Sequence, residues 1–112
     1  MTSTPEKVRC SHILLSWDKA MHSTHSRELS FAIHDAQKII ADLQKGNITW
    51  STAVKEHSAC NESWKKGGDL GWFPEHVIVP EIWRACLATP IDALFPEPII
   101  SPYGVHIIYR TG

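Results

Sequence analysis

The chain has 112 residues, the size of one compact domain, with 43% hydrophobic and 21% charged residues. This balance is typical of a folded globular protein and excludes a disordered chain. Eleven basic and twelve acidic residues give a formal net charge of −1, so no basic surplus points to nucleic acid or to an anionic membrane surface.

The first half of the chain predicts a strand, a loop and a helix. Val8–Leu15 is rich in β-formers and predicts a strand, preceded by a flexible tail over residues 1–7. Ser16–Ser30 lacks periodicity and predicts a polar loop. Apolar residues then recur at helical spacing from Ala32 to Leu43, and Gly46 is expected to end that helix.

The second half alternates short elements with turn residues. Thr49 is a suitable N-cap for a second helix. A loop follows from Ser58 to Gly71, and a short strand is expected around Leu70 to Phe73. Pro80 suits the first position of a further helix, and Val105–Tyr109 predicts a closing strand after a proline-rich stretch. The order of elements predicts one α+β domain spanning residues 1–112, with helices on a small, largely antiparallel sheet.

Three cysteines, Cys10, Cys60 and Cys86, stand at wide and irregular spacing. An odd count argues against a disulfide framework and predicts reduced thiols. Together with the absence of a signal-peptide pattern or a long apolar stretch, this predicts a cytoplasmic or nuclear location. A zinc site is not expected, because His57 with Cys60 supplies only half of a tetrahedral set.

Candidate chemical groups lie at three places: His12 in the first strand, His106 in the last, and Cys60 before the glycine-rich loop. Each has an ordinary structural interpretation, since a histidine in an apolar strand is most often a hydrogen-bonded core residue. The glycines Gly67, Gly68 and Gly71 match no phosphate-binding motif. These residues alone therefore predict a small α+β domain without a defined activity.

Four blocks in order resemble the parvulin family of peptidyl-prolyl cis/trans isomerases, and together they run from about Val8 to Arg110. The resemblance implies a four-stranded, mostly antiparallel sheet surrounded by about four helices. The blocks are the histidine-plus-aliphatic start His12–Leu15, the central signature Ser58–Cys60 with Gly67–Phe73, the helix start Val79–Glu81 and the closing strand Tyr103–Ile108.

The resemblance also implies a site. His12 and His106 correspond to the family's histidine pair, Cys60 to its Cys or Asp neighbour, and Ser101 to a Ser or Thr that completes the polar network. The family grips the proline ring with a Leu, a Met and a Phe. Here these positions hold Leu70, Ile78 and Ile82, and Phe73 is expected to join them in binding substrate.

Rotation about an Xaa-Pro bond crosses a barrier of about 20 kcal/mol but breaks no bond, so no cofactor or metal is expected. Cys60 is interpreted as a polar tuning group rather than a nucleophile, because family members also carry Asp there. The expected partners are proline-containing peptides or proteins, with no nucleic acid and no membrane, and the expected state is a monomer.

Two alternatives stay open. Ile78 and Ile82 stand where the family has an adaptable Met and a flat aromatic Phe. The second possible function is therefore a proline-peptide-binding module or chaperone with weak or no turnover. A phosphate-directed isomerase is the less favoured substrate class. The loop offers only sparse basic residues for a phosphate clamp: Lys19, His22, His25 and Arg27.

Overall fold

The computed structural model describes residues 5–20, 27–60 and 63–112. In these ranges three α-helices are present, together with two short 3₁₀ turns and five strands. The helices and turns are α1 (Leu29–Lys45), α2 (Trp50–His57), η1 (Trp64–Lys66), η2 (Glu75–Val77) and α3 (Pro80–Ala88). The strands are β1 (Val8–Leu15), β2 (Asp69–Phe73), β3 (Ala93–Leu94), β4 (Ile99–Ser101) and β5 (Gly104–Arg110).

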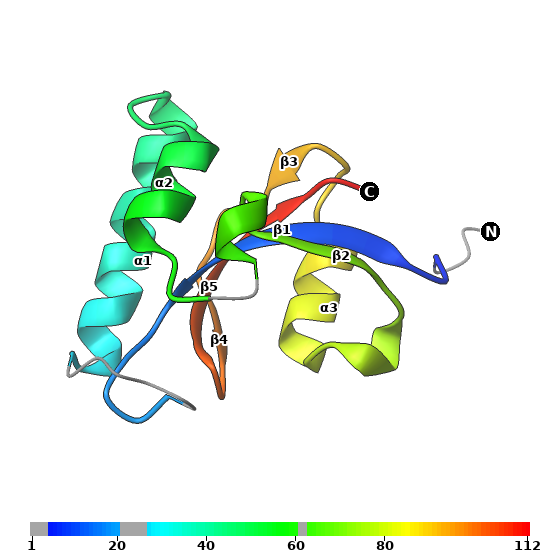
Figure 1. The fold of residues 1–112 in the computed structure, drawn as a ribbon, viewed down its shortest axis with the longest axis horizontal. Coiled ribbons are helices and arrows are strands. Elements are labelled where there is room, and N and C mark those ends of the chain that lie inside the picture. The colour runs from blue at the N-terminus through cyan, green and yellow to red at the C-terminus, as the bar shows by residue number, and fades with distance from the viewer. Residues whose placement is uncertain (1–4, 21–26, 61–62) are drawn as a thin grey trace.

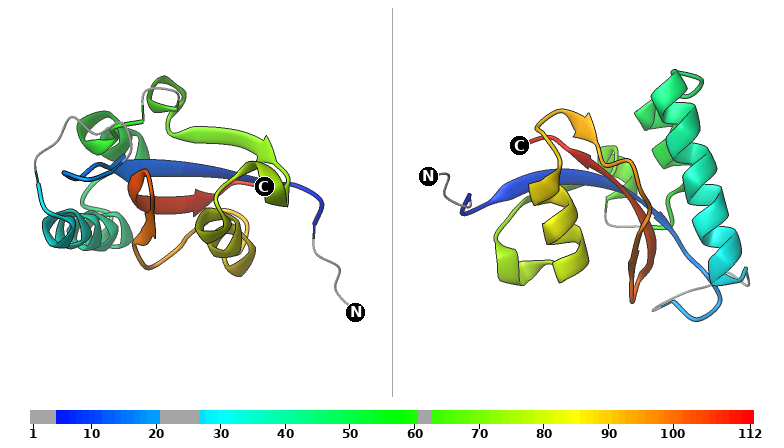
Figure 2. Two further views of the ribbon diagram at one scale, coloured as in Figure 1. Left: turned by 90° about the horizontal axis from the view of Figure 1, so that it is seen from below. Right: turned by 180° about the vertical axis from the view of Figure 1, so that it is seen from behind.

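The strands form one antiparallel sheet in the order β2-β1-β5-β3, and β4 also pairs with β5. Helices α1 and α2 lie to one side of the sheet and α3 to the other (Figures 1 and 2). The α+β class and the antiparallel sheet predicted from the sequence are confirmed.

Side chains along β1 point alternately to the two faces of the sheet, and each face has its own hydrophobic core. Ile13 and Leu15 face α1 and α2, where they pack with Ile107 and Val105 of β5. The other set of side chains faces α3 and packs in a second cluster with that helix. This second cluster contains Val8, Cys10, Phe73, Ile82, Trp83, Ala85, Cys86 and Ile108.

Local signals in the sequence set most element boundaries. Gly46 ends α1 in the left-handed region at φ 74°, as expected for a glycine at this position. Thr49 caps α2 by accepting a 3.2 Å hydrogen bond from the Thr52 N–H, and Pro80 opens α3. The first and last predicted strands are confirmed by β1 and β5.

Three details of the predicted architecture differ in the structure. The sheet has five described strands rather than four, and three α-helices rather than about four accompany it. Strands β3 and β4 are only two and three residues long and lie between prolines, so they carry no readable alternation. The predicted loop is also shorter, since α1 begins at Leu29. Of the predicted basic loop residues, His22 and His25 lie outside the described ranges.

The predicted reduced state of all three cysteines is wrong for two of them. Cys10 of β1 and Cys86 of α3 form a disulfide, with their Cα atoms 6.8 Å apart, and Cys60 is the free cysteine. The partners are separated by 76 residues, so only the packing of α3 on the sheet brings them together. The parity of the cysteine count therefore gives no support for an intracellular location, and disulfides persist mainly in oxidising compartments.

No helix among the described residues combines the length and the apolar composition needed to cross a bilayer.

A stability prediction follows from Gly68, whose carbonyl accepts a 2.9 Å hydrogen bond from the His12 N–H. Its φ is +84°, and a Cβ there would lie 2.5 Å from the His12 carbonyl oxygen. Gly71 has φ +74° with nothing within 4 Å of such a Cβ. We expect Gly71→Ala to lower the free energy of unfolding by about 1–2 kcal/mol, the cost of the left-handed backbone alone.

Gly68→Ala should lower the free energy of unfolding by at least about twice as much, because the β1 backbone must also shift. Urea titration of both variants measures the difference. Equal losses would show that the approach of this loop to β1 carries no energetic weight.

Candidate active site

A pair of buried histidines lies on the face of the sheet that α3 covers. His12 of β1 and His106 of β5 are 4% and 1% exposed. Their Nδ1 atoms are 2.9 Å apart, and the rings stack with centroids 5.1 Å apart. The β1–β5 register makes this contact possible, because it pairs Leu14 with His106 and His12 with Ile108 on the same face.

Ser101 extends the pair into a chain of three polar groups. Its Oγ lies 2.6 Å from His106 Nε2 and also accepts a 3.1 Å hydrogen bond from the Tyr103 N–H. The tight turn between β4 and β5, where Ser101 pairs with Gly104, places the hydroxyl at this distance. The structure thus brings His12, His106 and Ser101 together.

Both histidines are neutral at pH 7. Burial lowers the pKa of His12 to about 4 and that of His106 to about 3, with the neighbouring His12 as a second cause for His106. A neutral imidazole carries one N–H and one lone pair. The Nδ1–Nδ1 contact therefore requires one ring to donate and the other to accept.

In one arrangement of protons, the side-chain O–H of Ser101 and the ring N–H of His106 each have an acceptor. Ser101 Oγ–H donates to His106 Nε2, and His106 Nδ1–H donates to His12 Nδ1. His12 then carries its hydrogen on Nε2, which is buried and has no hydrogen-bond partner among the described residues. Leaving a buried donor unpaired costs about 1–3 kcal/mol, and such a group in a native protein calls for an explanation, for example a catalytic role or an ordered water.

Cys60 lies beside this strand but outside the hydrogen-bonded chain. The Ala59 N–H donates a 2.7 Å hydrogen bond to the Leu14 carbonyl, which holds the end of the α2 segment against β1. The Cys60 thiol is partly buried, and no hydrogen bond joins it to another described residue. Asn61 and Glu62, which follow it, lie outside the described ranges.

The four predicted pocket residues all belong to the α3-side core. Phe73 and Ile82 are each 3% exposed, whereas Leu70 and Ile78 are half-buried and pack against the same cluster. A ligand approaching this face would therefore meet Leu70 and Ile78 first. A separate cavity of about 460 Å³ contains none of the four; it is lined by Glu81, Arg84, Ala85, Ala88, Phe95, Pro98, Ile99 and Ile100.

The match to a family model decides the family. Residues 12–112 match the model described as "Rotamase: PPIC-type PPIASE domain", which is nearly the whole chain. The chain belongs to the parvulin family of peptidyl-prolyl isomerases. Its function is accordingly that of an enzyme that isomerises Xaa-Pro peptide bonds.

Curated relatives and a solved structure agree with this assignment. The chain is 33% identical to peptidyl-prolyl cis-trans isomerase pin1 of Rhizopus delemar, over 96% of this chain and 74% of the relative. It is 32% identical to peptidyl-prolyl cis-trans isomerase ESS1 of Saccharomyces cerevisiae, over 96% and 67%. The structure of ESS1 from Candida albicans superposes with a TM-score of 0.89 at 25% identity, covering all of this chain and 66% of that one.

An ion pair that was not predicted from the sequence joins β1 to β2. Asp69 accepts hydrogen bonds from Arg9 Nε at 3.1 Å and Arg9 Nη2 at 2.7 Å, and from the Gly71 N–H at 2.9 Å. The hydrogen bond from Arg9 is the main cause that lowers the pKa of Asp69. An Asp side chain that accepts from the backbone N–H two residues on is a known turn signal, but the pairing of Asp69 with Arg9, 60 residues away, has no local signature.

Metal ligands do not gather anywhere in residues 5–20, 27–60 and 63–112, since no group of three His, Cys, Asp or Glu side chains there could hold an ion.

From the buried histidine pair we expect acid to destabilise the parvulin fold already at pH values well above those at which carboxylates titrate. In the unfolded chain these histidines titrate near 6.5, whereas the folded values are about 4 and about 3. Between those values the unfolded state binds more protons, so the free energy of unfolding falls as the pH is lowered. We expect a loss on the order of 3 kcal/mol per histidine between pH 7 and 4.5.

Urea unfolding at several pH values in this window tests the prediction, with His106→Asn as the comparison. The variant should be less stable at pH 7 and should lose stability less steeply on acidification. Identical slopes for the two proteins would contradict the assignment of the acid sensitivity to this pair.

Proposed function

We propose that this parvulin domain rotates Xaa-Pro bonds without covalent chemistry, by binding the twisted amide better than either planar form. The observation that carries the proposal is the buried, neutral chain of Ser101, His106 and His12 beneath an apolar surface. Catalysis of this kind needs only groups that interact more strongly with the transition state than with the ground state.

The demands of the reaction fit these surroundings. Twisting the amide localises the nitrogen lone pair, which favours a dry, apolar environment around the proline ring. Leu70 and Ile78, backed by Phe73 and Ile82, are the residues we assign to the ring. The histidine chain supplies fixed dipoles, and since both rings are neutral, it adds no charge that would draw water into the site.

Cys60 is assigned a polar role at the edge of this site. A nucleophilic cysteine normally requires a base within hydrogen-bond reach, and neither histidine is hydrogen-bonded to this thiol among the described contacts. Attack by sulfur is also unnecessary for a bond rotation. Cys60→Asp should therefore retain turnover if the role is polar.

The proposed substrate is an unphosphorylated Xaa-Pro segment. Arg27, the strongest candidate for a phosphate clamp, donates from Nε to the Ser16 carbonyl at 2.7 Å and from Nη1 to Asp35 at 3.0 Å. Its guanidinium is thus occupied by an internal ion pair. Lys19 is the other basic residue of this loop in the described part of the chain, and a single lysine cannot bind phosphate in a bidentate manner.

The substrate class is tested with matched peptides that carry Ala-Pro, Ser-Pro, phosphoserine-Pro and Glu-Pro. Exchange NMR is expected to show turnover of all four, with kcat/KM for the phosphorylated peptide within about threefold of Ser-Pro, or roughly 0.7 kcal/mol. A preference of a hundredfold or so for phosphoserine would overturn the substrate assignment. Binding without any exchange would instead favour the peptide-binding module.

The polar chain is tested by Ser101→Ala, with Ser11→Ala as a matched control. Both serines are 7% exposed, but Ser11 is next to His12 in β1 and points to the opposite face. Removing the Ser101 hydroxyl releases His106 Nε2 and should lower kcat/KM about tenfold, which corresponds to about 1.4 kcal/mol.

Ser11→Ala should leave kcat/KM within about twofold, as expected for a change away from the site. Equal effects of the two substitutions on kcat/KM would remove Ser101 from the mechanism.

A further inference from the structure

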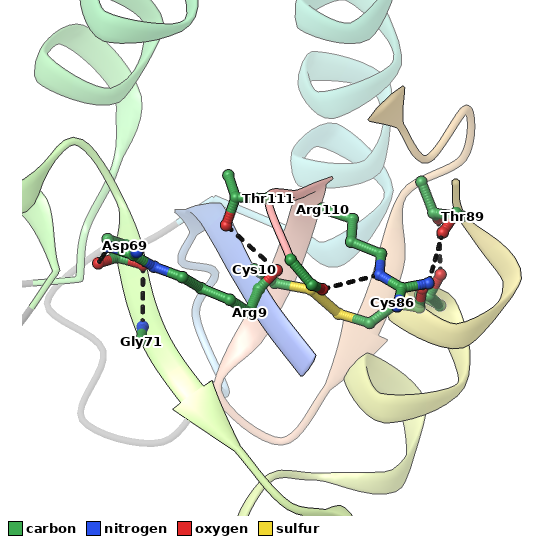
Figure 3. The surroundings of a disulfide bond; sticks show 10 residues. Arg9, Cys10, Asp69, Gly71, Cys86, Thr89, Arg110 and Thr111 are labelled. Carbon is green, nitrogen blue, oxygen red and sulfur yellow. Dashed lines mark hydrogen bonds and ion pairs between the residues drawn. A yellow bond between two sulfur atoms is a disulfide. The ribbon is translucent and has the colours of Figure 1, made fainter. Parts of the chain in front are cut away.

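The disulfide lies between the two parts of the site that the proposed mechanism needs. Cys10 and Cys86 are both fully buried in the α3-side core. Figure 3 shows the bridge running from the strand β1 to the helix α3, with Arg110 beside it. The mechanism described above makes no use of this bridge.

The positions of the two cysteines connect the bridge to specific site residues. Cys10 stands two residues before His12, so the two side chains emerge from the same face of β1. Cys86 stands four residues after Ile82, so these two lie on one side of α3, one turn apart. One covalent link therefore joins the strand that carries His12 to the helix that carries Ile82.

A non-covalent clamp acts on the same end of α3. Arg110, which pairs with Cys10 in the sheet, donates from Nη1 to the carbonyls of Cys86 at 3.3 Å and Thr89 at 3.0 Å. These contacts, which need no disulfide, satisfy carbonyls at the C-terminal end of the helix. With the apolar core around it, α3 would thus stay docked after reduction, but less firmly.

The N-terminal end of α3 has less to hold it. The helix is nine residues long, and Val79 provides no side-chain cap. A helix this short is not stable by itself in water, so its position depends on tertiary contacts. The preceding turn η2 is exposed, with Val77 at 73%, and leads through Ile78 into the helix.

We propose that the Cys10–Cys86 disulfide is a positioning element of the proline pocket, and that the thiol–disulfide state of this pair sets the affinity for Xaa-Pro substrates. This inference rests on the proposed assignment of Ile78 and Ile82 to the pocket. The bridge fixes the position of α3, and therefore of Ile82, relative to the face of β1 that carries His12. Reduction lets the helix move and loosens the apolar wall.

The redox step is a thiol–disulfide exchange. Closing the bridge removes two protons and two electrons from the Cys10 and Cys86 thiols, and a small disulfide such as oxidised glutathione takes them up as it becomes two thiols. Reduction by a small thiol is the reverse reaction. Because both cysteines are fully buried, exchange requires α3 to leave the sheet, so the bridged state is long-lived once it has formed.

The test compares the bridged and reduced forms of the unmodified chain. Alkylation of the unfolded protein followed by mass measurement should find one reactive thiol in the bridged form, that of Cys60, and all three after reduction with a phosphine. An Ala-Pro peptide is then titrated into each form by NMR. Hydrogen exchange of the α3 amides is followed in parallel.

We expect reduction to raise the peptide Kd and the KM by at least about threefold, while kcat changes by less than about twofold, because a loosened wall affects binding more than the polar chain. Hydrogen exchange over residues 80–88 should accelerate. If the bridge were purely structural, its reduction would lower the unfolding midpoint without this split between KM and kcat. Unchanged Kd and KM in the reduced form would overturn the proposal.

The matched control is the variant with Cys10→Ala and Cys86→Ala together. Its Kd should equal that of the reduced protein in oxidising and reducing buffer alike. If its Kd still responds to the buffer, Cys60 is responsible and the proposal fails. Should this variant not fold, the comparison of the two forms of the unmodified chain still decides. Absence of turnover in both forms, with a Kd that still shifts, would refute the proposed function but not the positioning role.

Discussion

The antiparallel pairing of β1 with β5 is the constraint on which the site depends. These two strands lie at opposite ends of the chain, and their register brings together two imidazoles that are 94 residues apart in sequence. The same register separates the two cores, since adjacent side chains of β1 face α1 and α2 or α3 in turn. A slip of β1 by one residue against β5 would turn His12 toward the α1–α2 core and Ile13 toward α3, and would separate His12 from His106. The hydrophobic alternation that selects the fold therefore also selects the geometry of the polar chain.

Burying three polar groups in an apolar core is unfavourable unless they satisfy one another. Here they do so almost completely, since among the polar side-chain atoms of Ser101, His106 and His12 only His12 Nε2 lacks a partner in the described part of the chain. The same burial that keeps both rings neutral also makes the fold sensitive to acid, because protonation places charge in a site from which solvating water is excluded. Burial of the two histidines is thus the common origin of two properties. It provides the dry surroundings that suit the proposed proline pocket, and it causes the destabilisation expected in mild acid.

The elements that could be predicted from the sequence are those whose deciding interactions are local. Gly46, Thr49 and Pro80 each fix a helix end through their own backbone or side chain, and alternation sufficed to find β1 and β5. Features that depend on contacts between distant segments could not be predicted. Strands β3 and β4 form because β5 offers them an edge, and the disulfide forms because α3 docks on β1. For the site, residues alone left His12 and His106 as ordinary core histidines. Family resemblance supplied the pairing, and it could not supply the Arg9–Asp69 contact or the placement of Cys60.

The two sides of the site differ in how firmly they are held. The histidine side is built on paired strands and a glycine loop that is bonded directly to the His12 backbone. The proposed pocket side rests on Ile82, in a nine-residue helix without an N-terminal side-chain cap, and on Ile78, two residues before that helix. The resemblance implies Phe and Met at these two positions in the family. Isoleucine is branched at Cβ and adapts less well than methionine to a poorly fitting wall. A pocket lined with stiff side chains is sensitive to the position of its supporting helix, and this chain fixes the end of that helix with a covalent bridge and an arginine clamp.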